Sequence, residues 1–306
     1  MADRIKGVMA AGLTLFNEDM TIDAEATLAH TKWLLQNGCD GVLLFGTTGE
    51  ANSLSMKERL DFLDKLGASG LPMDKLMIGT GCCAMPDTVE LTKATLGLGI
   101  RDTLMLPPFY YKNPSDDGLF AYFSKVMETI GSDDLRVYLY HFPQMSAVPF
   151  SHALIGRLLE AFPGQICGVK DSSGDFDNMK AMAERFENFD VFAGTERYLL
   201  DVLKVGGVGT ITATGNVTSS LCGAVYAAWK AESGEAEALQ EDLTAQRLAL
   251  QNYPAAAALK ELLARESGKP SWRTVRPPFQ TLADDKAAQL VADMENVSFK
   301  LPALAA

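Results

Sequence analysis

Short apolar segments alternate with longer amphipathic segments over about the first 230 residues of this chain, and this alternation limits what it can fold into. The longer segments carry apolar residues at helical spacing, whereas the short ones are typical of buried strands. Strands that alternate with helices in this way form a parallel sheet with crossover helices. Eight strands are predicted, at residues 8–13, 41–45, 75–79, 103–106, 136–140, 165–170, 191–193 and 208–212.

Eight strand–helix units are the number that closes a (β/α)8 barrel. An open, doubly wound sheet is the alternative, but no G-x-G-x-x-G pattern follows the first strand. Ser55 and Ser151 are expected to cap helices, and Gly38, Gly99 and Gly164 lie where helices should end. Helical patterns cover residues 24–36, 56–66, 87–98, 117–130 and 151–162.

No strand is expected after residue 230. Three further helical patterns follow, at residues 232–252, 254–267 and 283–294. The sequence therefore predicts a barrel domain at residues 1–230 and a C-terminal helical cap of about three helices at residues 231–306.

Charge and hydropathy exclude several classes of partner. The net charge is −12, and no run of Lys and Arg forms a basic stripe, so neither nucleic acid nor an anionic membrane surface is expected as a partner. No apolar stretch approaches the ~20 residues of a transmembrane helix, and the N-terminal residues do not resemble a signal peptide. We expect a cytoplasmic protein.

The cysteines and histidines show no metal-binding pattern. The five cysteines lack framework spacing and have apolar neighbours, which predicts reduced thiols buried as small hydrophobes. They are Cys39, Cys82, Cys83, Cys167 and Cys222. Of the three histidines only His141 lies near a strand end, so we expect neither a metal nor a cofactor.

Lys170 ends the sixth predicted strand, after a largely apolar run and directly before a turn at residues 171–174. Burial in an apolar site disfavours the charged ammonium and makes the amine a usable nucleophile. Such an amine can form a Schiff base with a ketone, an electron sink that needs neither metal nor cofactor. A solvated loop lysine is the alternative.

Other strand ends carry groups that suit this chemistry, because reacting groups in such barrels gather at the carboxyl ends of strands. Gly46, Thr47 and Thr48 follow the second strand, where hydroxyl and amide donors could bind a carboxylate; Thr48 capping the next helix is the alternative. Tyr140 ends the fifth strand and could relay a proton, or be a core tyrosine. His141 could bond a substrate hydroxyl or pack against a neighbouring loop.

Taken in order, these motifs resemble the dihydrodipicolinate synthase / N-acetylneuraminate lyase family of class I pyruvate-dependent aldolases. The resemblance covers nearly the whole chain. The matching segments are residues 13–16, 46–50, 58–59, 109–111, 140–143, 168–171, 206–209 and 275–278.

The resemblance implies a barrel without a cofactor, which acts on pyruvate or another 2-keto acid with an aldehyde, usually as a homotetramer (a dimer of dimers). Lys170 would form the Schiff base, and the loop of Gly46, Thr47 and Thr48 would bind the pyruvate carboxylate. Tyr140 would be the proton-relay acid and base.

Two further residues take roles from the resemblance alone. Tyr110 matches the tyrosine that reaches across a subunit interface to complete the relay, although Tyr110 and Tyr111 could equally be ordinary interface aromatics. Ile211 matches the residue that packs near the pyruvate moiety.

The sequence departs from the family pattern at Met145. In dihydrodipicolinate synthases an arginine at this position binds the carboxylate of the aldehyde partner, and Met145 cannot. The segment at residues 109–112 looks more like the sugar-acid members, and Lys112 there is either solvated or a contact for an anionic tail. We therefore expect an aldolase for a 2-keto-3-deoxy sugar acid or related 4-hydroxy-2-oxo acid. A sugar-acid dehydratase, a dihydrodipicolinate synthase and a keto-acid-binding sensor are the alternatives.

Overall fold

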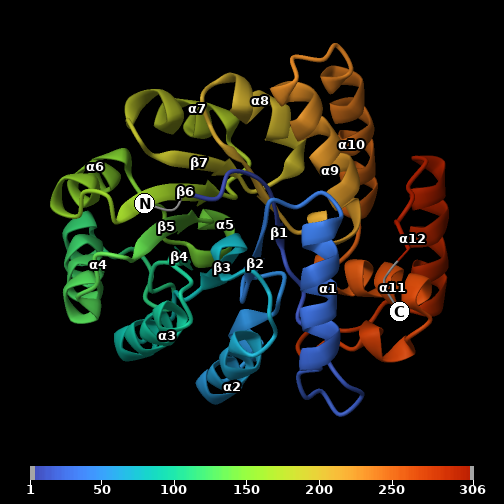
Figure 1. Ribbon diagram of the computed structural model, residues 1–306, viewed down its shortest axis with the longest axis horizontal. Coiled ribbons are helices and arrows are strands. Elements are labelled where there is room, and N and C mark those ends of the chain that lie inside the picture. The colour runs from blue at the N-terminus through green and yellow to red at the C-terminus, as the bar shows by residue number, and fades with distance from the viewer. Residues whose placement is uncertain (1–3, 304–306) are drawn as a thin grey trace.

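The computed structural model describes residues 4–303, in which eight parallel strands close into a barrel in chain order (Figure 1). The predicted (β/α)8 barrel is therefore confirmed, and the open sheet is excluded. The strands are β1 (Gly7–Ala11), β2 (Gly41–Leu44), β3 (Leu76–Gly79), β4 (Asp102–Met105), β5 (Arg136–His141), β6 (Ile166–Asp171), β7 (Asp190–Ala193) and β8 (Gly209–Thr212).

The barrel closes where β8 pairs with β1, in a register that places Gly7 opposite Gly209. A Cβ atom on Gly209 would lie 1.8 Å from the carbonyl oxygen of Gly7. Only glycine permits this approach, because the backbones of the two closing strands meet where a side chain would stand.

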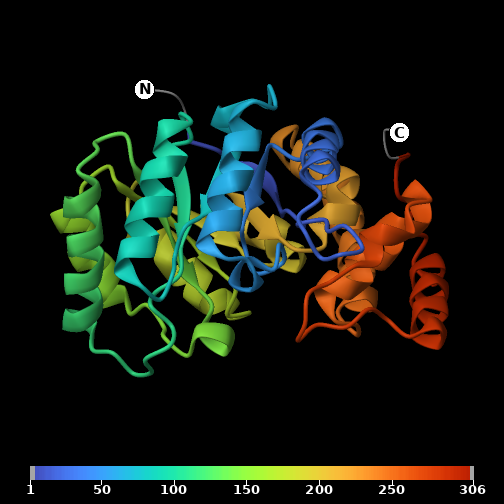
Figure 2. The same cartoon turned by 90° about the horizontal axis from the view of Figure 1, so that it is seen from below.

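Helices surround the barrel, and the last of them lie together on one side of it (Figures 1 and 2). The surrounding helices are α1 (Ala24–Gln36), α2 (Met56–Gly67), α3 (Met85–Gly97), α4 (Asp116–Ile130), α5 (Pro143–Ser146), α6 (His152–Ala161), α7 (Phe176–Arg185), α8 (Leu199–Lys204) and α9 (Gly215–Lys230). The final helices are α10 (Ala236–Leu250), α11 (Ala255–Ser267) and α12 (Asp284–Asn296). Short 3-10 turns are η1 (Ala51–Ser53), η2 (Met73–Lys75), η3 (Glu196–Tyr198) and η4 (Pro270–Arg273).

Local signals predicted most element ends to within one or two residues. Ser55 caps α2 with a reciprocal bond to Glu58, and the Ser151 hydroxyl accepts from the amide of Leu154. Lys170 is the penultimate residue of β6 rather than its last, since Asp171 still pairs with its neighbours. The expected end of the barrel domain, residue 230, is the last residue of α9.

Side chains from all eight strands fill the barrel, which is a packed core rather than a pore. The interior cluster consists of Ile5, Met9, Ala11, Leu43, Met77, Leu104, Tyr138, Tyr140, Cys167, Phe192 and Ile211. Because this core is filled, no channel runs through the barrel, and a ligand would bind at an end of it.

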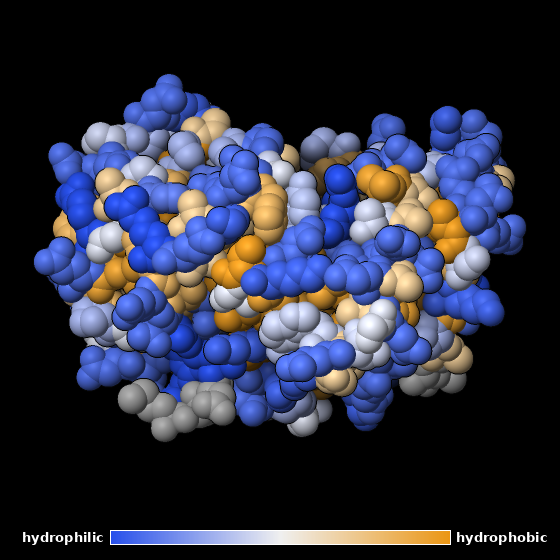
Figure 3. Space-filling view, turned by 90° about the horizontal axis from the view of Figure 1, so that it is seen from above, coloured by the Kyte–Doolittle hydropathy of each residue, from blue (hydrophilic) through white to orange (hydrophobic). Residues whose placement is uncertain are grey.

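The C-terminal helices pack against segments at the carboxyl end of the barrel. Leu259 and Leu263 of α11 share a cluster with Leu13 and Leu15, which follow β1, and with Val217 of α9. This packing holds α10 and α11 beside the strand ends where reacting groups are expected. The face in Figure 3 is mostly hydrophilic, with apolar residues gathered in small patches.

A charged cluster lies at the opposite, amino-terminal end of the barrel. Arg4 pairs with Asp190 at 3.1 Å, and Arg136 lies 3.5 Å from Asp102. The phenol of Tyr138 donates to Asp190 at 3.2 Å. Burial raises the pKa of Asp102 to about 6, although the charge of Arg136 opposes this. The native state therefore binds more protons than the unfolded chain between about pH 4 and pH 6.

We expect Asp102→Asn to remove a pH-dependent loss of stability. Because the folded carboxyl of Asp102 resists ionisation, this group should lower the free energy of unfolding of the parent as the pH rises from 4 to 6. Relative to the parent, the variant should gain up to about 3 kcal/mol between pH 4 and pH 7, measured by chemical denaturation. The exposed neighbour Asp133→Asn is the control. An equal pH dependence in parent and Asp102→Asn would contradict the prediction.

Candidate active site

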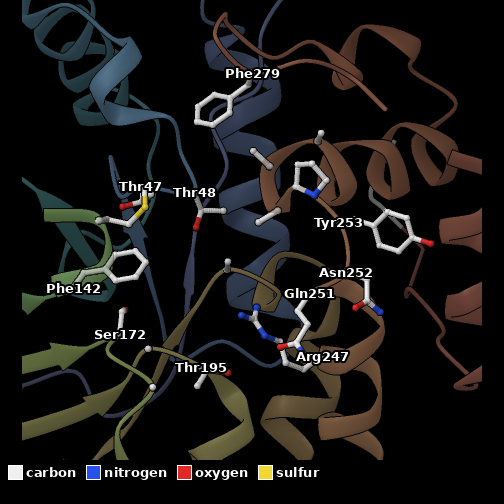
Figure 4. Close-up of a pocket in the computed structure, with 18 of the residues that line it drawn as sticks. Thr47, Thr48, Phe142, Ser172, Thr195, Arg247, Gln251, Asn252, Tyr253 and Phe279 are labelled. Carbon is white, nitrogen blue, oxygen red and sulfur yellow. The ribbon is translucent and has the colours of Figure 1, made fainter. Parts of the chain in front are cut away.

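A cavity of about 1040 Å³ lies between the carboxyl ends of the strands and the C-terminal helices. Thr47 and Thr48 after β2, Tyr140 of β5 and Lys170 of β6 line its barrel side. Figure 4 shows Thr47 and Thr48 facing the segment at residues 251–253 across this space. The structure thus brings four of the predicted site residues to one cavity.

Lys170 is a buried lysine without an acidic partner. Its residue is only 4% exposed, and within residues 4–303 its amine has no salt bridge or hydrogen bond to the protein. Its Nζ lies 4.6 Å from the centre of the Tyr140 ring. The solvated-loop alternative is therefore wrong, because the side chain rises from a paired strand and its amine reaches the cavity.

Tyr140 and Lys170 are neighbours because β5 and β6 pair in that register. The Tyr140 hydroxyl lies 3.4 Å from Oγ1 of Thr47, and its ring stacks on Phe142 at a centroid distance of 5.7 Å. A hydroxyl–hydroxyl contact beside an amine provides a short route for a proton between the loop after β2 and the lysine.

The loop after β2 is shaped by backbone contacts rather than by helix capping. Glu50 precedes the 3-10 turn η1 with a φ of 54°, and no side chain caps that turn, so the proposed capping role of Thr48 is wrong. Oγ1 of Thr14 donates to the carbonyl of Gly49 at 2.7 Å. Gly46 lies behind Thr47 in a small cleft that Tyr140 also lines. Thr48 is therefore left to face the cavity.

A buried ion pair anchors this loop to the C-terminal helices. Nζ of Lys260, on α11, donates to Glu50 at 2.6 Å, and both side chains are 0% exposed. The same Nζ donates to the carbonyl of Thr274 at 2.8 Å. Burial lowers the pKa of Lys260 to about 8, although the adjacent Glu50 carboxylate opposes this.

Arg276 completes the same connection. Its backbone amide donates to the second carboxylate oxygen of Glu50 at 2.9 Å, and its guanidinium pairs with Glu58. Hydrogen bonds from Arg276 lower the pKa of Glu58 to about 2. Phe16 lies below both cations, with Lys260 at 4.2 Å and Arg276 at 4.8 Å from the ring centre. The matching segments at residues 13–16, 46–50, 58–59 and 275–278 are far apart in sequence, and these contacts bring them together.

Tyr110 and Lys112 lie outside the cavity. Tyr110 is 73% exposed and contacts Tyr111 edge-to-face at 5.4 Å. Lys112 is exposed, and its Nζ donates to the carbonyls of Phe109 and of Ser146, the latter at 3.2 Å. In the structure of residues 4–303, neither Tyr110 nor Lys112 lines the cavity with Tyr140 and Lys170.

His141 and Ile211 also do not line the cavity. Nδ1 of His141 accepts a hydrogen bond from the amide of Phe150 at 3.1 Å, so the ring proton is on Nε2. Burial lowers the pKa of His141, while the nearby Asp171 opposes this, and the position favours packing against a loop over contact with a substrate. Ile211 is fully buried in the barrel interior, in the cluster that contains Tyr140.

The prediction of five buried cysteines is wrong for two of them. Cys83 is exposed and Cys82 half-buried, because both lie in the loop between β3 and α3. Cys39 and Cys167 are buried, which raises the pKa of their thiols to about 12 and about 11.

Across residues 4–303 no three His, Cys, Asp or Glu residues are grouped as metal ligands would be. No helix in the same range has the length and apolar character to cross a membrane.

Sequence reasoning missed Arg197 and Arg247, which line the cavity, and Lys260, which pairs with Glu50. Arg197 follows β7, so the rule that strand ends converge could have found it. Arg247 and Lys260 carry no such signal, because they reach this region only when α10 and α11 fold back on the strand ends.

The comparisons with known proteins agree with this geometry. The model of the dihydrodipicolinate synthetase family matches residues 4–297. The chain is 34% identical over 293 residues to an uncharacterized DapA-like lyase of Chloroflexus aurantiacus, covering 95% of this chain and 97% of that protein.

Solved structures match in fold as well as in sequence. A dihydrodipicolinate synthase from Agrobacterium tumefaciens has 32% identity and a TM-score of 0.87, with 95% of this chain and 99% of that one covered. The E. coli prophage protein YagE, crystallised with pyruvate, has 25% identity and a TM-score of 0.88, with 96% and 99% covered.

Fold, site and relatives together define a pyruvate-dependent aldolase or lyase built on a (β/α)8 barrel. The chain belongs to the dihydrodipicolinate synthetase family.

We expect Lys260→Met to destabilise the protein strongly. It leaves the Glu50 carboxylate buried without its partner, which costs about 3–5 kcal/mol in the free energy of unfolding. Adding Glu50→Gln to Lys260→Met should recover part of that loss, so the double variant loses less than the sum of the single ones. Chemical denaturation of the three variants measures this. Lys57→Met, which breaks an exposed pair with Asp61, is the control and should leave the free energy of unfolding nearly unchanged. Strictly additive losses would contradict the coupling.

Proposed function

We propose that the protein is a class I aldolase that cleaves or forms a 2-keto-3-deoxy sugar acid, or a related 4-hydroxy-2-oxo acid, through a Schiff base on Lys170. The observation that carries the proposal is the buried amine of Lys170, which lacks a partner in the part of the chain that the structure describes and lies against Tyr140. An unpaired buried lysine at the mouth of a barrel is costly for stability, which favours a chemical role.

In the cleavage direction, the neutral amine of Lys170 adds to the keto carbon C2. The Tyr140 hydroxyl gives its proton to the departing C2 hydroxyl, so that water leaves and an iminium ion and a phenolate remain. The phenolate takes the proton of the C4 hydroxyl, the C3–C4 bond breaks, and its electron pair moves into the iminium to give an enamine. An aldehyde leaves. Protonation of C3 and hydrolysis then free pyruvate and restore Lys170.

Thr47 and Thr48 would hold the carboxylate at C1. Both line the cavity beside Lys170, in a loop that presents hydroxyl and amide donors. Thr47 also contacts the Tyr140 hydroxyl at 3.4 Å, so carboxylate binding and proton transfer would share one loop. The pyruvate complex of the similar E. coli protein supports pyruvate as the keto acid.

Met145 supports a sugar acid over the aldehyde used by dihydrodipicolinate synthases. It lines the cavity and is 60% exposed, where those enzymes are expected to carry an arginine. A thioether cannot bind a carboxylate.

A Schiff-base dehydratase is the second candidate, and its product would be a 2,5-dioxo acid rather than pyruvate and an aldehyde. A non-catalytic sensor is disfavoured because Lys170 and Tyr140 meet at the cavity.

The proposal includes a cytoplasmic homotetramer in which Tyr110 acts in a neighbouring subunit. Its exposure and its absence from the residues that line the cavity of its own chain support this role. A tyrosine pair that protrudes from the barrel is suited to a subunit interface, where aromatic residues are enriched. We also propose that the chain divides into a barrel domain at residues 1–230 and a C-terminal helical cap at residues 231–306.

We expect borohydride added with pyruvate to reduce an iminium and leave a stable adduct on Lys170, located by mass spectrometry of the digested protein. Lys170→Ala should lose both the adduct and turnover. Lys112→Ala, the other lysine near a strand end, should keep the adduct. A parent protein without an adduct at Lys170 would refute the mechanism.

Tyr140→Phe should separate iminium formation from bond cleavage. It removes the phenol but keeps the ring against Lys170, so the borohydride adduct should still form. Turnover should fall by roughly 10²–10⁴-fold, the usual contribution of a general acid or base. Pyruvate release from a panel of 2-keto-3-deoxy acids measures it, with Tyr226→Phe on α9 as the control. Undiminished turnover in Tyr140→Phe would exclude Tyr140 as the relay.

A further inference from the structure

The cavity is cationic in a strongly acidic protein. The chain carries 39 acidic and 27 basic residues, yet the residues lining the cavity include four cations and not one aspartate or glutamate. The cations are Lys170, Arg197, Arg247 and Lys286. An arrangement so unlike the rest of the molecule attracts anions, since a cleft lined by one sign of charge concentrates its field.

Lys170 and the loop after β2 account for only one anionic group of a ligand. Arg197 comes from η3, after β7, and Arg247 from the last turn of α10. In Figure 4 the Arg247 side chain points from α10 toward the strand-end side of the cavity, where Thr195 lies. The two arginines thus approach the cavity from the barrel and from the C-terminal helices.

Neither guanidinium has an acidic partner in the part of the chain that the structure describes. Within residues 4–303 Arg197 and Arg247 form no salt bridge, and the Nε atom of each is buried without a hydrogen-bond partner. Arg197 contacts the Tyr198 ring at 5.7 Å, a contact that leaves its N–H edge available. Because both side chains line the cavity, an acidic ligand group there would accept hydrogen bonds from the parts of the guanidinium groups that face it.

We propose that Arg197 and Arg247 form a subsite for a second acidic group of the substrate, at the end of the carbon chain remote from the ketone. The proposal rests on the proposed function, because it takes the ketone to be held at Lys170. The substrate class is then a 2-oxo acid that ends in a carboxylate or a phosphate. Guanidinium groups suit both, since their planar N–H pairs match the spacing of oxygens in either group.

This subsite replaces, from another part of the fold, the cation that is missing at Met145. Met145 follows β5, whereas Arg197 follows β7 and Arg247 lies on α10. The acidic end of the substrate would therefore lie under the C-terminal helices. Lys286, exposed in the first turn of α12, adds a third positive charge at the rim.

The test compares three 2-keto-3-deoxy acids of equal chain length that end in a hydroxymethyl, a carboxylate or a phosphate group. The parent should prefer an acidic end in kcat/KM, and the better of the two acidic ends identifies the group. Arg197→Met and Arg247→Met should each lower that preference by roughly tenfold or more, the effect of losing a charge-assisted hydrogen bond. Arg247→Lys should restore part of it, and Arg185→Met, on the exposed end of α7, should leave it unchanged.

A binding measurement keeps the test independent of turnover. Calorimetry with a saturated 2-oxo diacid and the 2-oxo monoacid of equal length should show tighter binding of the diacid in the parent, and a smaller difference in both arginine variants. Unchanged preferences in Arg197→Met and Arg247→Met, in variants that still trap pyruvate on Lys170, would overturn the subsite alone. Failure of the parent to trap pyruvate would instead overturn the proposed function.

Discussion

The Glu50–Lys260 ion pair is the interaction on which the site depends most. Both side chains are inaccessible to solvent, so their charges are tolerable only together. The pair joins the loop that carries Thr47 and Thr48 to helix α11, more than 200 residues away in sequence. Together with the apolar packing of α11 against the residues after β1, the pair fixes the C-terminal helices over the strand ends, and the cavity lies between these two parts.

The barrel supplies the other half of the site through strand register. Pairing of β5 with β6 sets Tyr140 beside Lys170, and closure of β8 on β1 through Gly209 keeps the ring of strands intact. Under the proposed function, the reacting groups would lie on paired strands, whereas the groups that bind the substrate would lie on the segments after the strands and on α10.

Local sequence signals predicted the barrel well because strands, caps and turns depend on neighbouring residues. Ser55, Ser151 and the eight apolar segments are cases where the chain within a few residues determines the outcome. Lys170 could also be predicted as a site residue, since its place after an apolar run is itself a local pattern. Its partners Thr47 and Tyr140 followed from the rule that strand ends converge, together with the family resemblance.

The sequence could not reveal contacts that depend on tertiary folding alone. Lys260 lies in an alanine- and leucine-rich helix, where a solvated position is the ordinary expectation for lysine, and nothing nearby names Glu50 as its partner. The orientation of His141 toward Phe150 and the exposure of Cys83 are further examples, since each depends on how a loop leaves its strand.

A crystal structure of the protein soaked with pyruvate tests the central claim most directly. The account predicts continuous density between Nζ of Lys170 and C2 of pyruvate, with the pyruvate carboxylate within hydrogen-bond distance of the loop that carries Thr47 and Thr48. Pyruvate bound without a covalent bond to Lys170, or with its carboxylate directed away from that loop, would contradict it.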